Sequence, residues 1–373
     1  MHSKRVIIIF LGIVLSVLVI TNLVVFATIA QTFSLNSGTS RIWLWFALAI
    51  LSLAFIGITI LGRRYYNSVT RVITRVLSAY MGFFAYAFLA ALVYGLMIMI
   101  GWGSHPLGLG LFLLVVLVSL YGLWHARRIQ ISRVTVPLPS REWQSRRAVF
   151  VSDLHLGQVL GPTFARSIAE RIMALRPDLI LIGGDLFDGT AAPDLPKLIA
   201  PLRALSAPQG VFFVTGNHEE FGDSSPFLRA IENLGITILR DDYRVIDGLQ
   251  LVGVDDTTCE HREDFARILA GLGLDRTKPA ILLRHQPKDL DVAAASGITL
   301  QLSGHTHRAQ QWPFEYLAQW AFRGYAYGLK KYGAMAVYTS SGVGTWGPPL
   351  RVGTNAEIVE VSFGGTIGRN AFK

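Results

Sequence analysis

The chain has 373 residues, 51% of them hydrophobic and only 16% charged, with a formal net charge of +9. This composition is too apolar for an ordinary soluble protein, and the length allows two or more domains. The basic excess lies in the apolar first part. Residues 1–144 hold eleven Lys or Arg and one acid, whereas residues 145–373 hold 23 basic and 24 acidic residues. Such a distribution is typical of membrane flanks, so we expect a lipid bilayer, and no nucleic acid, among the partners.

Four stretches without charged side chains are long enough to cross a bilayer as helices, at residues 6–30, 42–62, 76–102 and 106–124. A cleaved signal peptide is the alternative for the first stretch, but an apolar run of about 25 residues exceeds the roughly 7–15 of a signal peptide. Basic residues gather before the first span, between the second and third, and after the fourth: Lys4, Arg5, Arg63, Arg64, Arg71, Arg75, Arg127, Arg128 and Arg133. This alternation predicts both termini, and the large C-terminal domain, on the cytoplasmic side.

We therefore expect a four-helix transmembrane domain at residues 1–126, a linker at 127–145 marked by Pro137 and Pro139, and a second domain at 146–373. In the second domain, strand-like apolar runs alternate with helical periodicity. Strands are expected within 148–153, 179–185, 211–218, 236–256, 280–287, 300–307, 334–342 and 356–363. Helices are expected within 162–178, 194–205, 226–235, 261–273 and 289–297. The early strands are continuous apolar runs, as in a sheet covered on both faces, so the fold class is α/β.

Polar side chains follow five of these apolar runs at the point where each run ends. In α/β sheets, ligands collect beyond the carboxyl ends of the strands, so we expect these side chains to converge. Singly, the aspartates are also explained as helix caps, the asparagine as a turn residue and the lone histidine as a satisfied polar group, but these alternatives leave the convergence unexplained. The residues are Asp153 and His155; Asp185; Asn217 and His218; His285; and His305 and His307.

The last pair lies in the stretch SGHTHR, residues 303–308. In an extended chain, residues two apart point to the same side, so His305 and His307 would face one point. Gly304 would allow the backbone to approach a bound ion closely.

The five blocks D-x-H (153–155), G-D (184–185), G-N-H-E (216–219), His285 and G-H-x-H (304–307) occur in this order over about 155 residues. Together they resemble the calcineurin-like metallophosphoesterase family. The resemblance implies a four-layer α/β/β/α sandwich and hydrolysis of a phosphate ester by a hydroxide activated by two divalent ions. It assigns Asp153, His155 and His307 to the first ion, Asn217, His285 and His305 to the second, and Asp185 to both. His218 would act beside the leaving group, and Asp188 would orient it.

The metal ligands predicted in this way are imidazole, carboxylate and amide groups. Such a set favours manganese, with iron, zinc or magnesium as alternatives. The single cysteine, Cys259, is not among the expected ligands.

The substrate is less narrowly defined by the sequence. Residues 338–361 resemble the closing strands of the membrane-linked bacterial branch of the family, which implies the bacterial inner membrane as the location. Arg351 follows a Gly- and Pro-rich turn and is a candidate for contacting a substrate phosphate, or is a surface arginine. Arg308 replaces the glycine usual in that branch and either binds an anionic substrate or faces solvent. Residues 312–333 combine aromatic and basic side chains, as at a membrane interface, or form an ordinary insertion.

Three functions remain open at this point. The first is hydrolysis of a phosphodiester or pyrophosphate bond in a membrane lipid or a lipid-linked substrate. The second is a membrane-tethered phosphoesterase for soluble nucleotides or phosphoproteins. The third is a scaffold without activity, which degenerate metal ligands would indicate.

Overall fold

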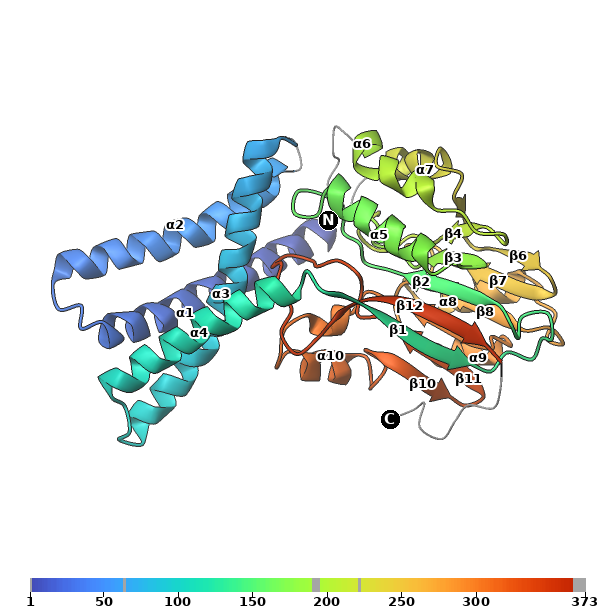
Figure 1. The fold of residues 1–373 in the computed structure, drawn as a ribbon. Helices are drawn as coiled ribbons and strands as arrows, with labels where there is room; N and C mark the ends of the chain where they lie inside the picture. The colour runs from blue at the N-terminus through green and yellow to red at the C-terminus, as the bar shows by residue number, and fades with distance from the viewer. Residues whose placement is uncertain (1, 63–64, 190–194, 221–222, 365–373) are drawn as a thin grey trace. The chain divides into compact units, whose positions relative to one another are not determined.

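The computed structural model describes residues 2–62, 65–189, 195–220 and 223–364, with side chains described from residue 16 onward. The chain divides into two compact units. One comprises residues 1–62, 67–124 and 347–350, and the other comprises residues 63–66, 125–346 and 351–373. Figure 1 shows the elements of both.

The first unit contains the four helices α1 (His2–Thr32), α2 (Gly38–Gly62), α3 (Ser68–Met99) and α4 (His105–His125). Within the part of the chain whose side chains are described, the helices α2, α3 and α4 are long and apolar enough to cross a membrane. They agree with three of the four predicted spans. The apolar part of α1 with described side chains is the shorter stretch Ser16–Thr32. The side chains of the rest of the first predicted span, residues 6–15, lie outside the described part of the chain. So do those of Arg63 and Arg64, on which the predicted orientation partly depends.

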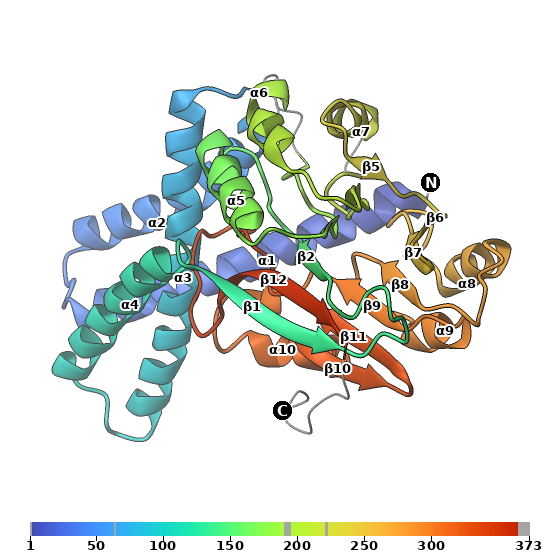
Figure 2. The same ribbon diagram turned by 45° about the vertical axis from the view of Figure 1, so that its right-hand side comes forward.

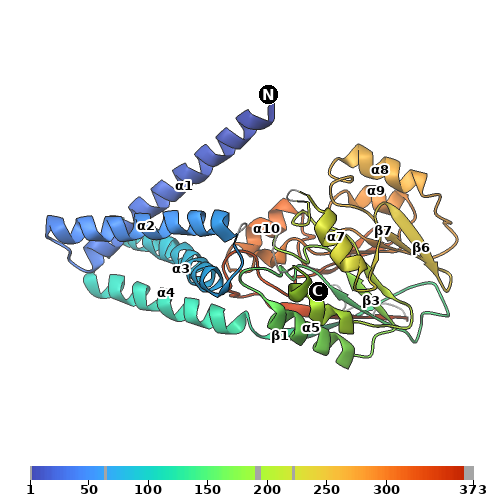
Figure 3. The same cartoon turned by 90° about the horizontal axis from the view of Figure 1, so that it is seen from above.

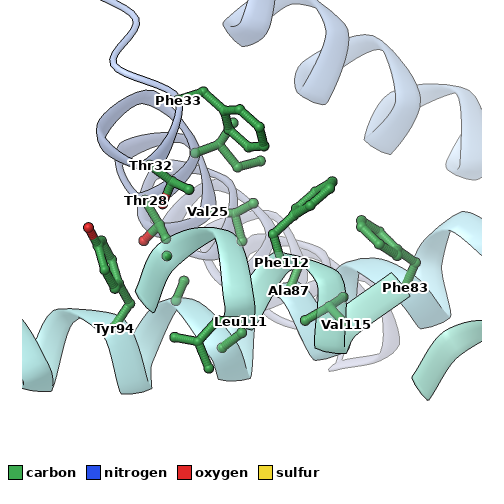
Figure 4. Close-up of a pocket in the computed structure, with 14 residues that line it drawn as sticks. Val25, Thr28, Thr32, Phe33, Phe83, Ala87, Tyr94, Leu111, Phe112 and Val115 are labelled. Atoms are coloured by element: carbon green, nitrogen blue, oxygen red, sulfur yellow. The ribbon is translucent and has the colours of Figure 1, made fainter. Parts of the chain in front are cut away.

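Helix packing in this unit combines small, apolar and paired polar side chains, as is usual between membrane helices. Asn22 of α1 donates to Ser52 of α2 at 3.1 Å, and both side chains are buried. A small apolar crevice lies between α1, α3 and α4 and is lined by side chains such as Val25, Phe112 and Val115 (Figure 4).

The second unit contains two six-stranded sheets. The first has the order β1 (Ile129–Val136), β12 (Ala356–Phe363), β2 (Arg147–Val151), β3 (Leu179–Ile182), β4 (Val211–Phe213) and β5 (Thr237–Ile238). The second has the order β10 (Gly328–Tyr332), β11 (Met335–Thr339), β9 (Leu300–Ser303), β8 (Ala280–Leu283), β7 (Leu249–Gly253) and β6 (Asp242–Ile246). Strands β2, β3, β4 and β5 are mutually parallel, as are β7, β8 and β9.

Alternating side chains of the strands build three apolar cores, because successive residues of a strand point to opposite faces. Residues such as Phe150 and Leu181 meet Leu251 and Leu283 between the two sheets. The opposite face of the first sheet is covered by α5 (Pro162–Ala174), α6 (Leu195–Ile199) and α7 (Ser225–Glu232). The opposite face of the second sheet is covered by α8 (Arg262–Gly271) and α9 (Leu290–Ala295). The predicted four-layer α/β/β/α order is therefore confirmed, and Figure 3 shows α5 and α8 on opposite sides of the strands.

The stretch expected as a linker, residues 127–145, belongs to the α/β unit. Residues 129–136 form β1, which pairs in parallel with β12 over eight residue pairs, beginning with Ile129 and Ala356 (Figure 2). Trp143, farther along the expected linker, is fully buried in the core between the sheets. The α/β unit thus begins directly after α4, with only three residues between His125 and β1.

Candidate metal centre

The loops that follow β2, β3, β4, β8 and β9 bring together the side chains that were predicted from the sequence to converge. Their arrangement follows from the topology, because the carboxyl ends of these parallel strands lie along one edge of the two sheets. The groups that could hold a metal ion are Asp153, His155 and His307; His155, Asp185 and His218; and Asp185, His285 and His305, the ligand atoms of each group lying within 4.8 Å of one another.

The first cluster is built from β2 and β9. Nε2 of His155 lies 2.9 Å from Nε2 of His307, and the latter lies 3.4 Å from Oδ1 of Asp153. All three side chains are buried. Two imidazole nitrogens and a carboxylate oxygen therefore face one point, which suits a divalent cation.

The second cluster is built from β3, β4, β8 and β9. Nε2 of His285 lies 3.1 Å from Oδ2 of Asp185, and Nδ1 of His305 lies 2.8 Å from Oδ1 of Asn217. The same Oδ2 of Asp185 lies 3.8 Å from Nε2 of His155 in the first cluster. Asp185 therefore stands between the clusters, where its carboxylate can serve both.

A backbone carbonyl fixes the orientation of the His285 ring in the way expected of a metal ligand. Its Nδ1 donates to the carbonyl oxygen of Gly183 at 2.7 Å, which fixes the tautomer and turns Nε2 toward the cluster. That Nε2 is buried and faces Oδ2 of Asp185 at 3.1 Å across the cluster. A backbone carbonyl that orients the second ring nitrogen is the usual arrangement around a metal-binding histidine, so the site fits.

The pKa shifts differ among the predicted ligands: nearby aspartates outweigh burial and raise the pKa of His155 and of His285, whereas three other ligands are shifted toward the states that bind a cation. Burial lowers the pKa of His305 to about 3 and that of His307 well below its ordinary value, so both rings are neutral at pH 7. Burial alone would raise the pKa of Asp185, but His285, His155 and His218 outweigh it and lower that pKa. Neutral imidazole and ionised carboxylate are the states in which these groups bind metals.

The backbone at the site departs from regular structure. Asp153, His155, Asp185, His305 and His307 all have positive φ, between 47° and 70°. Strained backbone of this kind clusters at functional sites. A Cβ at Gly304 would collide with Oδ2 of Asp153, so only glycine fits there.

The conformation expected for SGHTHR is therefore wrong. His305 and His307 do not lie on an extended strand, since both are left-handed and Thr306 between them is right-handed helical. The Thr306 side chain accepts from the backbone N–H of Arg308 and donates to the carbonyl oxygen of Ala326. The two rings consequently point to different clusters, as the family resemblance implied.

His218, the predicted acid, lies beside both clusters. Its backbone N–H donates to Oδ1 of Asp185 at 2.9 Å, and its ring centroid is 4.7 Å from that of His155. The exposed ring of Trp346 meets it edge-on at 5.7 Å. Asp188 was expected to orient His218. It does act electrostatically on His218, but its Oδ1 also lies 3.4 Å from Nδ1 of His155, so it orients a predicted ligand as well.

Glu219 has a positioning role that the sequence did not reveal. Its side chain is fully buried. Its carboxylate accepts backbone N–H groups of Asp185, Phe187 and Gly216 at 2.8–3.0 Å. Glu219 thereby joins the β3 loop to the β4 loop, and its place as the last residue of the block G-N-H-E was the available signal.

Arg351 does not have the substrate contact expected for it. The side chain is fully buried, and its guanidinium donates to four backbone carbonyl oxygens, those of Ser341, Gly342, Gly344 and Asn355. Both terminal nitrogens of the guanidinium are thus engaged in closing the loop behind Asp153. A buried charge needs hydrogen-bond partners, and here backbone carbonyl oxygens supply them. The guanidinium therefore does not face solvent.

Replacing Arg351 with lysine is expected to lower the free energy of unfolding by about 3 kcal/mol, because one ammonium group cannot reach all four carbonyls. Denaturant unfolding of the detergent-solubilised chain, followed by near-UV circular dichroism, measures this. Arg267→Lys on the exposed face of α8 is the matched control. A raised KM with unchanged stability would restore the substrate-binding role.

Arg308 is held in place by its neighbours. Its Nε forms an ion pair with Glu315 at 2.8 Å, and its guanidinium lies over the ring of Tyr327 at 4.6 Å. The side chain is partly exposed beside His307, so its predicted role in binding an anionic substrate stays a prediction.

Comparison with known proteins agrees with this geometry. Residues 146–309 match the model of the calcineurin-like phosphoesterase family. An uncharacterised metallophosphoesterase of Aquifex aeolicus is 30% identical over 219 residues, which cover 57% of this chain and 83% of that protein. The chain belongs to the metallophosphoesterases. Members of this family are metal-dependent phosphoric ester hydrolases with a dinuclear divalent metal site.

Other metallophosphoesterases extend the comparison. One from Helicobacter pylori J99 is 38% identical over 216 residues, covering 57% of this chain and 58% of that protein. A transmembrane protein with metallophosphoesterase domain from Bos taurus is 34% identical over 237 residues, covering 58% of this chain and 52% of that protein. The alignments thus span less than two thirds of these two relatives. Among metallophosphoesterases, the chain has both bacterial and transmembrane relatives.

Proposed function

We propose that the protein is a membrane-anchored phosphoesterase that uses two divalent ions to hydrolyse a phosphodiester or pyrophosphate bond. The observation that carries this proposal is the position of Asp185, whose Oδ2 lies 3.1 Å from His285 in one ligand cluster and 3.8 Å from His155 in the other. A shared carboxylate holds two ions close together, and such a pair supplies an activated water and charge neutralisation for displacement at phosphorus.

The protein's own groups account for the remaining chemistry. Asp153, His155 and His307 would hold one ion, and Asn217, His285 and His305 would hold the other. His218 lies next to both clusters and gives a proton to the leaving oxygen. Burial lowers the pKa of His218 against the raising effect of Asp185, so the ring releases its proton readily when it carries one, and its protonated fraction falls as the pH rises. The fixed backbone of Asp185, tied to Glu219, keeps these groups aligned.

Manganese is the metal that we favour, with iron, zinc or magnesium as alternatives. The ligands are imidazole, carboxylate and amide, and Cys259 lies in a different core of the domain. This mixture of nitrogen and oxygen ligands suits manganese and provides no thiolate that would select zinc.

We further propose that the enzyme lies in the bacterial inner membrane as a multi-pass protein, with its catalytic domain on the cytoplasmic side and a lipid or lipid-linked substrate. Support comes from the apolar helices, from the basic residues between them and from the transmembrane relative. All the predicted metal ligands are present, which disfavours the scaffold alternative.

The test uses the full chain in lipid nanodiscs with manganese, offered a panel of radiolabelled bacterial lipids and soluble nucleotides. The matched control is Asn217→Ala, which removes one predicted ligand. Release from lipids alone, lost in the control, would support the proposal. Equal turnover of soluble diesters would instead establish the tethered enzyme for soluble substrates, and turnover of nothing would contradict an enzymatic role.

A further inference from the structure

A group of large apolar side chains projects from α10 (Glu315–Ala321) and the residues just before it. Trp312, Tyr316, Leu317 and Trp320, which we call the aromatic face, are all more than half exposed, Trp320 to 83%. Residues 316 and 320 are four apart and so share one side of the helix, with Leu317 beside them. Exposed apolar groups gathered in this way mark an interaction surface rather than scattered surface residues.

The aromatic face is attached to the metal centre. Glu315 of α10 pairs with Arg308, which directly follows the predicted ligand His307. Phe322, just after α10, meets the ring of His305 at 5.8 Å. The backbone N–H of Trp312 donates to the carbonyl oxygen of Val352 at 2.8 Å. Whatever covers the aromatic face therefore lies next to the catalytic groups.

We propose that the aromatic face lies in the interface of a lipid bilayer, at the depth of the head groups. Tryptophan and tyrosine prefer this layer because their rings are apolar and their N–H and O–H groups stay hydrated. Exposed Arg323 and Lys331 follow the face and complement anionic head groups. The negative charge of Glu315 is already paired with Arg308, so it does not oppose this contact.

The connection to the membrane helices holds the domain within reach of the bilayer. Three residues separate His125 at the end of α4 from Ile129 at the start of β1. A fully extended chain across that interval spans about 14 Å, which keeps the α/β unit at the membrane surface. At the high local lipid concentration that results, even a small apolar surface is occupied. The contact would present lipid head groups to the metal centre, and this consequence rests on the proposed function.

The contact can be measured without reference to activity. A nitroxide is attached at Trp320→Cys in the full chain, reconstituted in nanodiscs containing anionic lipid. Burial raises the pKa of Cys259 to about 11, so the native thiol stays unlabelled. Arg267→Cys, at a position 77% exposed on α8, is the control. We expect oxygen to reach the Trp320 label more readily than a water-soluble nickel reagent, and the reverse at position 267. Equal accessibility to the two reagents at both sites would overturn the proposal. Strong spin–spin coupling between labels on two copies of the chain would also overturn it, because it would indicate that a second copy covers the face.

A second measurement separates this inference from the proposed function. Trp320→Glu is compared with Val245→Glu, since Val245 is also an exposed apolar residue of the same unit. We expect Trp320→Glu to raise KM about tenfold for a vesicle-borne substrate and to leave turnover of a soluble phosphodiester unchanged. An unchanged KM would count against the contact. If the parent protein turns over neither substrate, the proposed function fails while the nitroxide result still decides the contact.

Discussion

Replacing Asp185 with asparagine is expected to lower kcat for a phosphodiester about a thousandfold or more, and to reduce the metal content of both clusters. The amide keeps the shape of the side chain and can still accept the backbone N–H of His218. It removes the negative charge that lies between the two clusters, 3.1 Å from His285 and 3.8 Å from His155. Metal analysis of the purified chain and steady-state kinetics measure the two effects.

Asp264→Asn, on α8, is the matched control because it makes the same chemical change at an exposed ion pair. It should retain full metal content and activity. If Asp185→Asn also retained two metal ions per chain with unchanged kcat, the assignment of Asp185 as the shared ligand would be wrong.

Glu219→Gln is expected to lower the free energy of unfolding by about 2 to 3 kcal/mol and the metal affinity by about ten- to a hundredfold. Both carboxylate oxygens of Glu219 accept backbone N–H groups. In glutamine one of these oxygens is replaced by an NH2 group, which is a donor and would face a backbone N–H donor. The loops that carry Asp185 and Asn217 then lose their shared support. Denaturant unfolding and metal titration measure the two effects separately.

Glu232→Gln, at an exposed position on α7, is the corresponding control and should change neither quantity. A loss of activity in Glu219→Gln with normal stability and normal metal affinity would point to direct participation of Glu219 in the reaction, against a positioning role.

The convergence of the site could be predicted from the sequence because it depends on strand ends. Runs such as 148–151 and 179–182 are short and wholly apolar, and buried parallel strands place whatever follows them at one edge. Which of these side chains belong to which cluster was implied only by the resemblance of the five polar blocks to the metallophosphoesterases. No long-range pairing had to be known for this step.

Features that depend on distant partners could not be predicted in this way. Residues 129–136 alternate weakly and precede two prolines, so nothing local showed that β1 pairs with β12. Arg351 looked available for a substrate because its four carbonyl partners become neighbours only when the loop closes. The left-handed His305 donates its backbone N–H to the carboxylate of Asp153, a partner 152 residues away that an H-x-H pattern does not encode.

The pairing of β1 with β12 bears on how the protein is made. Ile129 is translated early, directly after the last membrane helix, yet its neighbour in the sheet is Ala356. The ribosome must therefore deliver more than two hundred further residues before β1 acquires its partner. Domains in general fold as units once their residues are available, so this one matures after its membrane helices have left the ribosome. During that interval β1 lacks its neighbour in the sheet, and an unpaired strand is exposed to mispairing with another chain.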